Sequence, residues 1–271
     1  MNKLEEASKR ALVIGGGIAG IQSALDLADM GIHVDLIEKK PCIGGRMAQL
    51  DKTFPTNDCS ICILAPKLSE CNRHTNITLH TLSEVQKIEG EAGNFSVEVL
   101  KHARYVKEDE CINCGDCVEK CPMRVEDEFD RGLRKRRAIY MYYLQGVPAV
   151  MTIDKKNCLW FTKEACRICE KNCDRDAIDF DQRDQVLTLD NVGSIIVATG
   201  YDVIEDVSPL SNYGYNKYRN VVTGLEFERL LCASGPQEGH LKRISDGKPP
   251  KKIAFLQCVG SRDARERKYC S

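Results

Sequence analysis

The chain has 271 residues, of which 42% are hydrophobic and 29% charged, and 39 basic against 40 acidic side chains leave a net charge of −1. This balance gives no global electrostatic reason to bind nucleic acid or an anionic membrane. The abnormal number is the 15 cysteines. Because that count is odd and no export signal precedes it, the composition argues against a secreted disulfide framework and favours metal or redox chemistry.

No uninterrupted apolar segment approaches the roughly 18 residues that a membrane-spanning helix needs. We therefore expect a cytoplasmic protein without a membrane span. The five histidines form no Ser-His-Asp or Cys-His pattern, so no catalytic side chain is predicted.

The first motif in the chain is a glycine-rich turn between two predicted strands. Residues 11–14 read as a buried strand, residues 15–20 open an amphipathic helix that runs to Met30, and a second strand over 32–37 ends in Glu38. Strand, G-x-G-x-x-G, helix, strand and terminal acid together form the dinucleotide-binding fingerprint.

Each part of this fingerprint has a physical task. Gly15 permits the tight turn, Gly17 lets a pyrophosphate approach the backbone, and Gly20 lets the helix pack on the strand. The helix N-terminus offers N–H groups and a partial positive charge to the phosphates. Glu38 would accept hydrogen bonds from the ribose of the adenosine half, and its carboxylate disfavours a 2′-phosphate.

FAD and NAD share the fingerprint, and two later features favour FAD. The run Gly-Gly-Arg-Met at 44–47 follows soon after Glu38, and an apolar strand over 194–198 leads into Thr199 and Gly200. In flavoproteins with two dinucleotide domains, the Gly-Gly pair lies near the flavin and the Ala-Thr-Gly turn closes the cofactor site. The residues predicted to contact FAD are Gly15, Gly17, Gly20, Glu38, Lys39, Gly45, Arg46, Thr199 and Gly200.

Eight cysteines between these halves form two ferredoxin-like motifs, whose short gaps let successive thiolates point at one cubic cluster. The first motif is followed by proline and consists of Cys111, Cys114, Cys117 and Cys121. The second has a seven-residue first gap and no proline, and consists of Cys158, Cys166, Cys169 and Cys173. Soft thiolates select iron–sulfur clusters or zinc.

Two 4Fe–4S clusters are the leading interpretation of these motifs. In two-cluster ferredoxins the fourth cysteine of each motif binds the other cluster, so Cys173 would complete the first site and Cys121 the second. Zinc is an alternative, although its four ligands normally come in two close pairs. A single cluster is another, because the long gap after Cys158 departs from the usual spacing.

Taken in order, these pieces closely resemble the A subunit of heterodisulfide reductase, an iron–sulfur flavoprotein of methanogens with relatives in many anaerobes. The resemblance covers essentially the whole chain. Besides the ferredoxin-like segment, the matching runs are 44–55, 57–62, 91–95, 223–229 and 257–263.

The resemblance implies an α/β fold: a Rossmann-like, thioredoxin-reductase-like FAD-binding domain interrupted by an inserted two-cluster ferredoxin-like α+β domain. The expected boundaries are 1–103 for the first half of the FAD-binding domain, 104–179 for the insert, and 180–271 for the second half. The last segment would also begin an incomplete second nucleotide-binding-like module, with 253–256 as one strand. Family members are typically longer, so the chain resembles an N-terminal portion or a short form.

The implied function is electron transfer between FAD and the clusters, with flavin-based electron bifurcation as a further family property. The expected partners are other subunits of a heterodisulfide-reductase-like complex and a ferredoxin or a hydrogenase- or dehydrogenase-type donor. The disulfide-reducing site of the family lies on a different polypeptide of the complex. A truncated scaffold that binds clusters and docks partners without turnover is the alternative.

The remaining cysteines leave several interpretations open. Cys59, Cys62, Cys71 and His74 have the spacing of a zinc set, and unligated or redox thiols beside the flavin are the second alternative. The third, suggested by the family, is a noncanonical cluster that uses Cys59 and Cys62 with distant cysteines such as Cys258 and Cys270. A redox disulfide between Cys59 and Cys62 is disfavoured, because Pro55 and Asp58 indicate a loop rather than a helix.

Cys42 and Cys232 are expected to be small buried residues without a chemical role.

Overall fold

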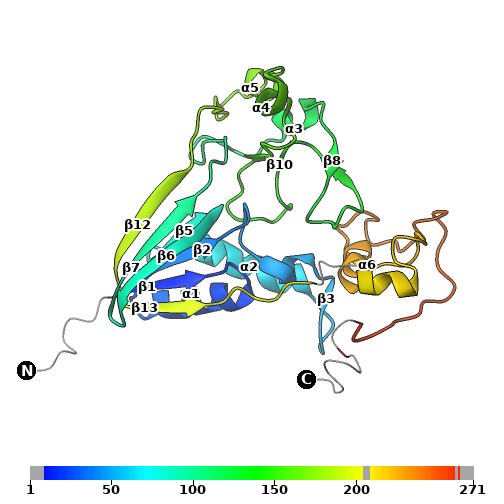
Figure 1. Cartoon of the computed structure of the whole chain (residues 1–271), viewed down its shortest axis with the longest axis horizontal. Coiled ribbons are helices and arrows are strands. Elements are labelled where there is room, and N and C mark those ends of the chain that lie inside the picture. Colours follow the sequence, from blue (N-terminus) through cyan, green and yellow to red (C-terminus); the bar gives the residue numbers. More distant parts are fainter. Residues whose placement is uncertain (1–8, 204–207, 260–261, 263–271) are drawn as a thin grey trace, which may run out of the picture. The chain divides into compact units, whose positions relative to one another are not determined.

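The computed structural model describes residues 9–203, 208–259 and 262 (Figure 1). The chain divides into two compact units, Met1–Gly200 and Tyr201–Ser271. The first unit therefore holds both the dinucleotide fingerprint and the cysteine-rich segment. The domain boundaries expected from the sequence remain a prediction.

A four-stranded parallel sheet in the order β13-β1-β2-β5 forms the base of the first unit. Its strands are β1 (Arg10–Ile14), β2 (His33–Glu38), β5 (Ile77–Thr81) and β13 (Ser194–Val197). In register, Leu12 of β1 lies between Ile195 and Asp35. Because the strands are parallel, their carboxyl ends meet at one edge, as in the predicted Rossmann-like fold.

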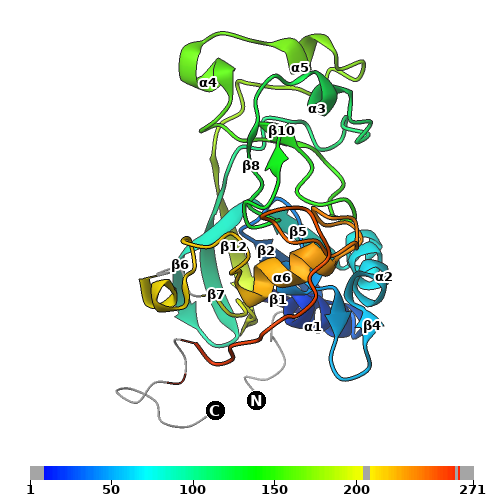
Figure 2. The ribbon, with the colours of Figure 1, turned by 90° about the vertical axis from the view of Figure 1, so that its right-hand side faces the viewer.

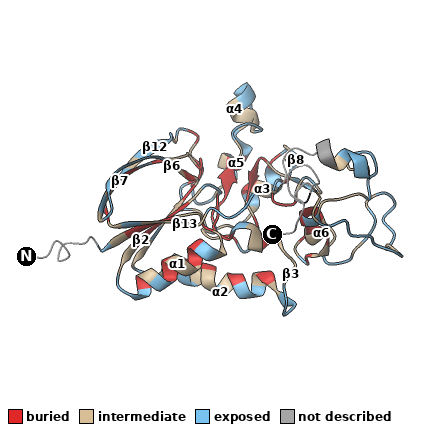
Figure 3. Ribbon diagram, turned by 60° about the horizontal axis from the view of Figure 1, so that its bottom comes forward, coloured by how far each residue is buried: buried red, intermediate tan, exposed pale blue. Residues whose placement is uncertain are grey.

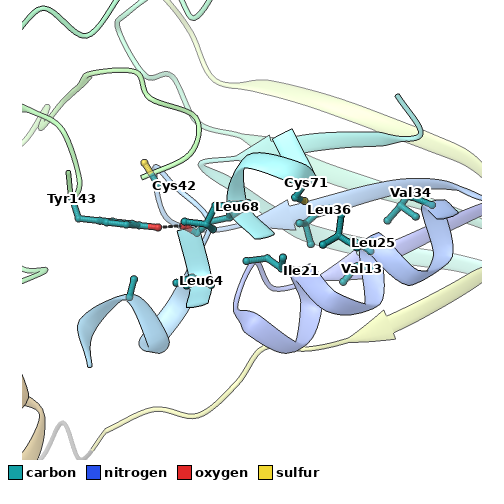
Figure 4. Packing of buried hydrophobic residues seen from close by; sticks show 14 of the residues in the cluster. Val13, Ile21, Leu25, Val34, Leu36, Cys42, Leu64, Leu68, Cys71 and Tyr143 are labelled. Carbon is teal, nitrogen blue, oxygen red and sulfur yellow. Dashed lines mark hydrogen bonds between the residues drawn. The ribbon is translucent and has the colours of Figure 1, made fainter. Parts of the chain in front are cut away.

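Two helices cover one face of this sheet, α1 (Ile18–Asp29) and α2 (Ser60–Arg73). Each turns one buried stripe inward and leaves the opposite face exposed (Figure 3). The stripes meet the sheet in a core whose fully buried members include Val13, Ile21, Leu36, Leu64 and Leu68 (Figure 4). This spacing of apolar residues is what fixes both helices to the sheet.

An antiparallel sheet covers the other face. It has the order β12-β7-β6 and consists of β12 (Gln185–Val192), β7 (Asn94–Lys101) and β6 (Ser83–Glu91). Leu12 and Ile37 of the parallel sheet pack against Val97, Val99 and Leu189 of this sheet. The parallel sheet is therefore the middle of three layers, which leaves its carboxyl edge as the place for a ligand.

The cysteine-rich insert leaves and re-enters this antiparallel sheet at one point, because Lys101 of β7 pairs with Gln185 of β12. Just beyond that pair, Asp184 accepts hydrogen bonds from the Ala103 N–H at 2.9 Å and from His102 Nδ1 at 2.9 Å. These two hydrogen bonds lower the pKa of Asp184 below its usual value. These two hydrogen bonds link the residues just before the insert to a residue just after it.

Short elements make up the insert. Its helices are α3 (Asp116–Lys120), α4 (Leu159–Lys163) and α5 (Ile168–Lys171). Its two hairpins pair β8 (Val125–Glu126) with β9 (Lys135–Arg136) and β10 (Ile139–Tyr140) with β11 (Thr152–Ile153). Within the first unit, the three helices gather at the end remote from the parallel sheet (Figures 1 and 2).

The second unit contains the 3-10 helix η2 (Ser208–Tyr213) and the helix α6 (Gly224–Leu231). Thr223 and Glu226 form a reciprocal capping box that starts α6. The strand expected over 253–256 was wrong, because these residues are exposed and lie outside every strand that the structure describes. A strand needs a hydrogen-bonding neighbour, and this segment has no ladder partner among the described residues.

The connection between β2 and α2 contains the 3-10 helix η1 (Gly45–Gln49) and a hairpin of β3 (Lys52–Thr53) and β4 (Asp58–Cys59).

No helix among the described residues has both the length and the apolar character that crossing a bilayer requires.

Candidate functional site

The carboxyl edge of the parallel sheet brings the turn after β1 and the turn after β13 together. A Cβ atom added to Gly15 would overlap the carbonyl oxygen of Ala198, and Gly15 also has φ +111°, so only glycine fits there. A Cβ on Gly20 would overlap the carbonyl oxygen of Gly15, which shows how closely α1 packs on the turn. This is the point where strand order reverses, the usual ligand position in such sheets.

The second glycine-rich loop touches the first. The N–H of Gly44 donates to the carbonyl of Gly16 at 2.6 Å. Gly45 has φ +57°, and a Cβ atom there would lie 2.7 Å from the Cα of Gly17. Two loops that the sequence assigns separately to the phosphate and flavin parts of one cofactor are thus in direct backbone contact.

Glu38 joins the same cluster from the end of β2. Its carboxylate accepts the N–H of Gly16 at 2.8 Å and the N–H of Lys40 at 2.7 Å. Burial raises the pKa of Glu38, and these two hydrogen bonds oppose the rise. Each carboxylate oxygen has a further lone pair that could accept a hydrogen bond from a hydroxyl group.

The other predicted FAD contacts lie around this edge. The Lys39 side chain is mostly exposed and pairs with Glu84 at 3.4 Å, so its charge points toward β6. Arg46 Nη1 donates to Gln49 Oε1 at 3.1 Å within η1. Thr199 and Gly200 are exposed directly after β13.

This edge fits an adenine dinucleotide. Gly17 is the N-cap of α1 and has no side chain to cover the first N–H groups of that helix, and Ala19 in its first turn is exposed. Backbone free of Cβ atoms, an open helix N-terminus and a terminal acid are the three features that hold a pyrophosphate and a ribose.

Residues of the insert support the second glycine-rich loop, and sequence reasoning missed them. The N–H of Ile43 donates to the carbonyl of Val147 at 2.8 Å, and the Tyr143 hydroxyl donates to the carbonyl of Ile43 at 2.5 Å (Figure 4). The ring of Tyr143 stacks on Phe129 at 4.9 Å, and both rings belong to the core beneath α1 and α2. The insert therefore completes the core of the dinucleotide-binding part.

A buried arginine makes a second connection. Arg104 Nη2 donates to the carbonyl of Pro41 at 2.9 Å and to Thr81 Oγ1 at 2.6 Å. Its Nη1 donates to the carbonyl of Val150 in the insert at 3.4 Å. Its Nε also donates to Glu108 Oε1 at 3.3 Å. No sequence motif marks Arg104, because Pro41, Thr81 and Val150 are distant in the chain and two of these three accept through main-chain carbonyls.

The eight motif cysteines line two separate cavities in the insert. The first cavity includes Cys111, Cys114, Cys117 and Cys173. The second includes Cys121, Cys158, Cys166 and Cys169. Each cavity thus takes three cysteines from one motif and the last from the other, which is the grouping that cross-ligation requires.

The long gap of the second motif holds a helix. α4 occupies most of the residues between Cys158 and Cys166, and Cys158 is its N-cap. Glu164 ends the helix in the left-handed conformation with φ +51°, and the chain then returns so that Cys166 lines the same cavity as Cys158. The departure from ferredoxin spacing is therefore an extra helical turn.

The donor set in these cavities suits an iron–sulfur cluster, whose iron ions are cationic. Burial, with smaller contributions from neighbouring cysteines, raises the pKa of both Cys117 and Cys169 to about 12. Cysteine binds metal as thiolate, so bound iron would supply the positive charge that these sites need. Among the described residues, no group of three or more ligating side chains is arranged for a single ion.

The zinc set suggested by the sequence is not assembled. Cys59 and Cys62 form a disulfide. Cys71 is fully buried in the core, where burial raises its thiol pKa to about 12. His74 faces Asp29 instead, with 3.3 Å between Nε2 and Oδ1.

The expectation of a loop around the Cys59–Cys62 pair was also wrong, and with it the argument against a disulfide there. Cys59 is the N-cap of α2, so the pair begins a 14-residue helix. Asp58 and Cys59 form a strand before it, and Pro55 lies in the hairpin tip. The turn-forming residues do form a turn, but that turn ends before Cys59.

The remaining cysteines are scattered. Cys42 and Cys232 are buried, as expected. Cys258 is partly buried in the second unit, and Cys270 lies outside the described residues.

Comparison with known proteins gives the following likenesses. A family model described as an NAD(P)-binding Rossmann-like domain matches residues 13–65. The second iron–sulfur A subunit of the CoB–CoM heterodisulfide reductase of Methanopyrus kandleri is 56% identical over 267 residues, which are 98% of this chain and 40% of that protein. The A subunit of the H(2):CoB-CoM heterodisulfide,ferredoxin reductase of Methanothermobacter thermautotrophicus is 50% identical over 272 residues, with the same two coverages.

The chain thus spans about 40% of the length of these curated relatives. Among solved structures, L-proline dehydrogenase from P. horikoshii is 28% identical, with a TM-score of 0.29, over 35% of this chain and 20% of that one.

Proposed function

The chain belongs to the family of heterodisulfide reductase A subunits, and we propose that it transfers electrons between a bound FAD and two 4Fe–4S clusters. The observation that carries this proposal is the contact between the insert and the glycine-rich loop. Tyr143 and Val147 of the insert bind the main chain of Ile43, one residue before Gly44. Flavin and cluster sites would therefore share one packed framework.

FAD is proposed for the carboxyl edge of the parallel sheet. The α1 N-terminus would hold the pyrophosphate, Glu38 would accept the ribose hydroxyls, and the loop at Gly44 and Gly45 would lie along the flavin. When bound, FAD supplies both two-electron and one-electron chemistry. The chain's own contribution is to fix that loop through hydrogen bonds that the insert donates and accepts.

The clusters are proposed for the two cysteine-lined cavities of the insert. Cys111, Cys114 and Cys117 would bind one cluster together with Cys173. Cys121 would join the three cysteines of the second motif at the other. Apolar lining such as Ile139 and Ile153 at the second cavity would keep water away from that cluster and so influence its potential.

We extend the complex-forming role of the relatives to this chain as part of the same proposal. The names of the relatives assign them to complexes acting on the CoB–CoM heterodisulfide, and one name includes ferredoxin. The partners would be other subunits of such a complex and a ferredoxin or a hydrogenase- or dehydrogenase-type donor, in the cytoplasm. Flavin-based electron bifurcation is proposed as the more specific form of this electron transfer.

Cofactor analysis of the anaerobically purified chain tests the proposal. We expect about one FAD and about eight iron per chain. Cys114→Ala should remove one cluster's electron paramagnetic resonance signal after reduction and leave FAD bound. Cys232→Ala, which changes a buried cysteine outside both cavities, is the matched control and should keep full iron.

Three outcomes would contradict parts of the proposal. Zinc in place of iron would remove the cluster assignment. Protein with full iron and no FAD would favour the scaffold alternative, which docks partners without turnover. Bound FAD that never exchanges electrons with the reduced clusters would exclude electron transfer between them.

A further inference from the structure

The Cys59–Cys62 disulfide has no place in the function proposed above, yet its setting is specific. Its Cα atoms lie 5.2 Å apart at the start of α2. Farther along the same helix, Leu64, Leu68 and Cys71 are fully buried, so the helix is held firmly in the core. Cys59 is partly buried and Cys62 is exposed. The pair therefore joins one partly buried and one exposed cysteine.

The surroundings of Cys59 suit a thiolate. As the N-cap of α2, its sulfur accepts the N–H of Cys62 at 3.3 Å. The positive end of a helix favours a negative charge at this position. In the β3–β4 hairpin, Lys52 pairs directly with Cys59, and cross-strand partners lie on the same face of a hairpin. The helix N-terminus and the cross-strand position of Lys52 thus both favour a negative charge on the sulfur that would leave when the disulfide opens.

Apolar side chains lie exposed on both sides of the pair in sequence. Phe54, at the tip of the β3–β4 hairpin, is 95% exposed. Ile63, the residue after Cys62, is 37% exposed. An exposed aromatic side chain on the hairpin that carries Cys59 offers a protein partner an apolar contact close in sequence to the disulfide.

We propose that Cys59 and Cys62 form a redox-active disulfide that accepts two electrons from a dithiol carrier protein. A thiolate of the carrier attacks Cys62 Sγ, the Cys59–Cys62 bond breaks, and Cys59 leaves as a thiolate. The carrier's second thiolate then attacks the carrier sulfur that is bonded to Cys62 in the mixed disulfide. This step releases Cys62 and leaves the carrier oxidised to a disulfide. Two protons complete the two thiols. This exchange does not depend on FAD or on the clusters.

The pair can be followed by alkylation of the folded holoprotein. Protein equilibrated anaerobically in glutathione buffers of increasing potential is pulsed with N-ethylmaleimide, and the cysteine peptides are weighed. Labelling of Cys59 and Cys62 should disappear together with a two-electron dependence, while iron and FAD contents stay constant. Cys71 on the same helix is the internal control and should remain unlabelled throughout.

Two variants test the setting. Lys52→Glu should slow reduction by dithiothreitol, a small dithiol that attacks as its thiolate, about two- to fivefold, and Lys87→Glu on β6 should not. Phe54→Ser should slow reduction by reduced thioredoxin, used as a protein dithiol, and leave the rate with dithiothreitol unchanged.

Clear results would overturn the inference. Cys59 and Cys62 that stay fully labelled in oxidised glutathione form no redox disulfide. A Cys59→Ser or Cys62→Ser variant that loses iron while Cys71→Ser keeps it would make the pair cluster ligands instead. FAD and iron are measured in the same samples as the alkylation. A missing cofactor, which contradicts the proposed function, is therefore distinguished from an absent redox disulfide, which contradicts this inference.

Discussion

The hydroxyl of Tyr143 donates a hydrogen bond of 2.5 Å to the carbonyl of Ile43, across 100 positions of sequence. Through this bond the cysteine-rich insert holds the main chain that leads into Gly44 and Gly45. Burial raises the pKa of the Tyr143 phenol well above its usual value, so the hydroxyl keeps its proton over the whole physiological range.

Tyr143→Phe should weaken FAD binding about three- to tenfold, because the stacked ring stays while one hydrogen bond to the loop is lost. Flavin fluorescence titration of the deflavinated protein measures the change, and iron content should stay constant. Tyr218→Phe, an exposed tyrosine of the second unit, is the control. Equal affinity in Tyr143→Phe and wild type would show that the insert does not support the flavin loop.

Gly45→Ala should abolish FAD binding or reduce it more than about 100-fold, because the new Cβ meets the Cα of Gly17 at 2.7 Å in addition to the left-handed backbone. Gly31→Ala separates these two effects, since Gly31 has φ +81° with nothing within 4 Å. That control should lose only about 1–2 kcal/mol of unfolding free energy from backbone strain and keep its FAD affinity. Similar flavin loss in both variants would make the close contact irrelevant.

Pairs of cysteine variants should reveal which cavity each cysteine serves. Cys121→Ala combined with Cys166→Ala should retain about four iron, because both line the second cavity. Cys121→Ala combined with Cys117→Ala should retain almost none, because each cavity loses one ligand. Iron and sulfide analysis distinguishes these results. The opposite pattern would assign Cys121 to the cluster of its own motif.

Asp35 should make stability depend on pH in the acid range. Burial opposes its ionisation, but hydrogen bonds from His80 at 2.9 Å and Arg10 at 2.6 Å outweigh burial and hold its pKa below the usual 3.8. A lowered carboxyl pKa contributes stability above pH 3.8, and that contribution is lost as pH falls through the folded-state value.

Asp35→Asn should therefore lower the unfolding free energy by about 1–3 kcal/mol at pH 7, with the difference from wild type shrinking below about pH 4. Urea unfolding followed by circular dichroism at several pH values measures this. Asp58→Asn, which changes an exposed carboxyl, is the control and should leave the unfolding free energy at pH 7 nearly unchanged. A difference that grows toward low pH would reverse the assigned sign.

Local patterns in the sequence predicted the dinucleotide edge well. The turn at Gly15, the helix that follows it and Glu38 at the end of β2 lie within 24 residues, so hydrophobic periodicity and turn chemistry were sufficient to order them. The spacing of the cysteine motifs likewise predicts a local ligand geometry, and the two cavities group the cysteines as that prediction expects.

The Cys59–Cys62 pair shows where local signals fail. Turn-forming residues just before the pair indicated a loop, while the buried face of Leu64 and Leu68 against the sheet decides that α2 begins at Ser60. Tertiary packing overrides local propensity at such boundaries.

Short-range spacing was enough to specify a Rossmann-like strand-turn-helix-strand unit and two ferredoxin-like cysteine motifs, because each depends on residues a few positions apart. The grouping of Cys121 and Cys173 with the opposite motifs was already expected from the cysteine spacing, and the two cavities have that grouping. The folded chain was needed to establish that Tyr143 and Arg104 join the insert to the sheet. These contacts join residues that are far apart in the chain, and several of them end on main-chain carbonyls, which every residue carries. A side-chain pattern cannot predict a hydrogen bond to the main-chain carbonyl of a distant residue, so these contacts are known only from the folded structure.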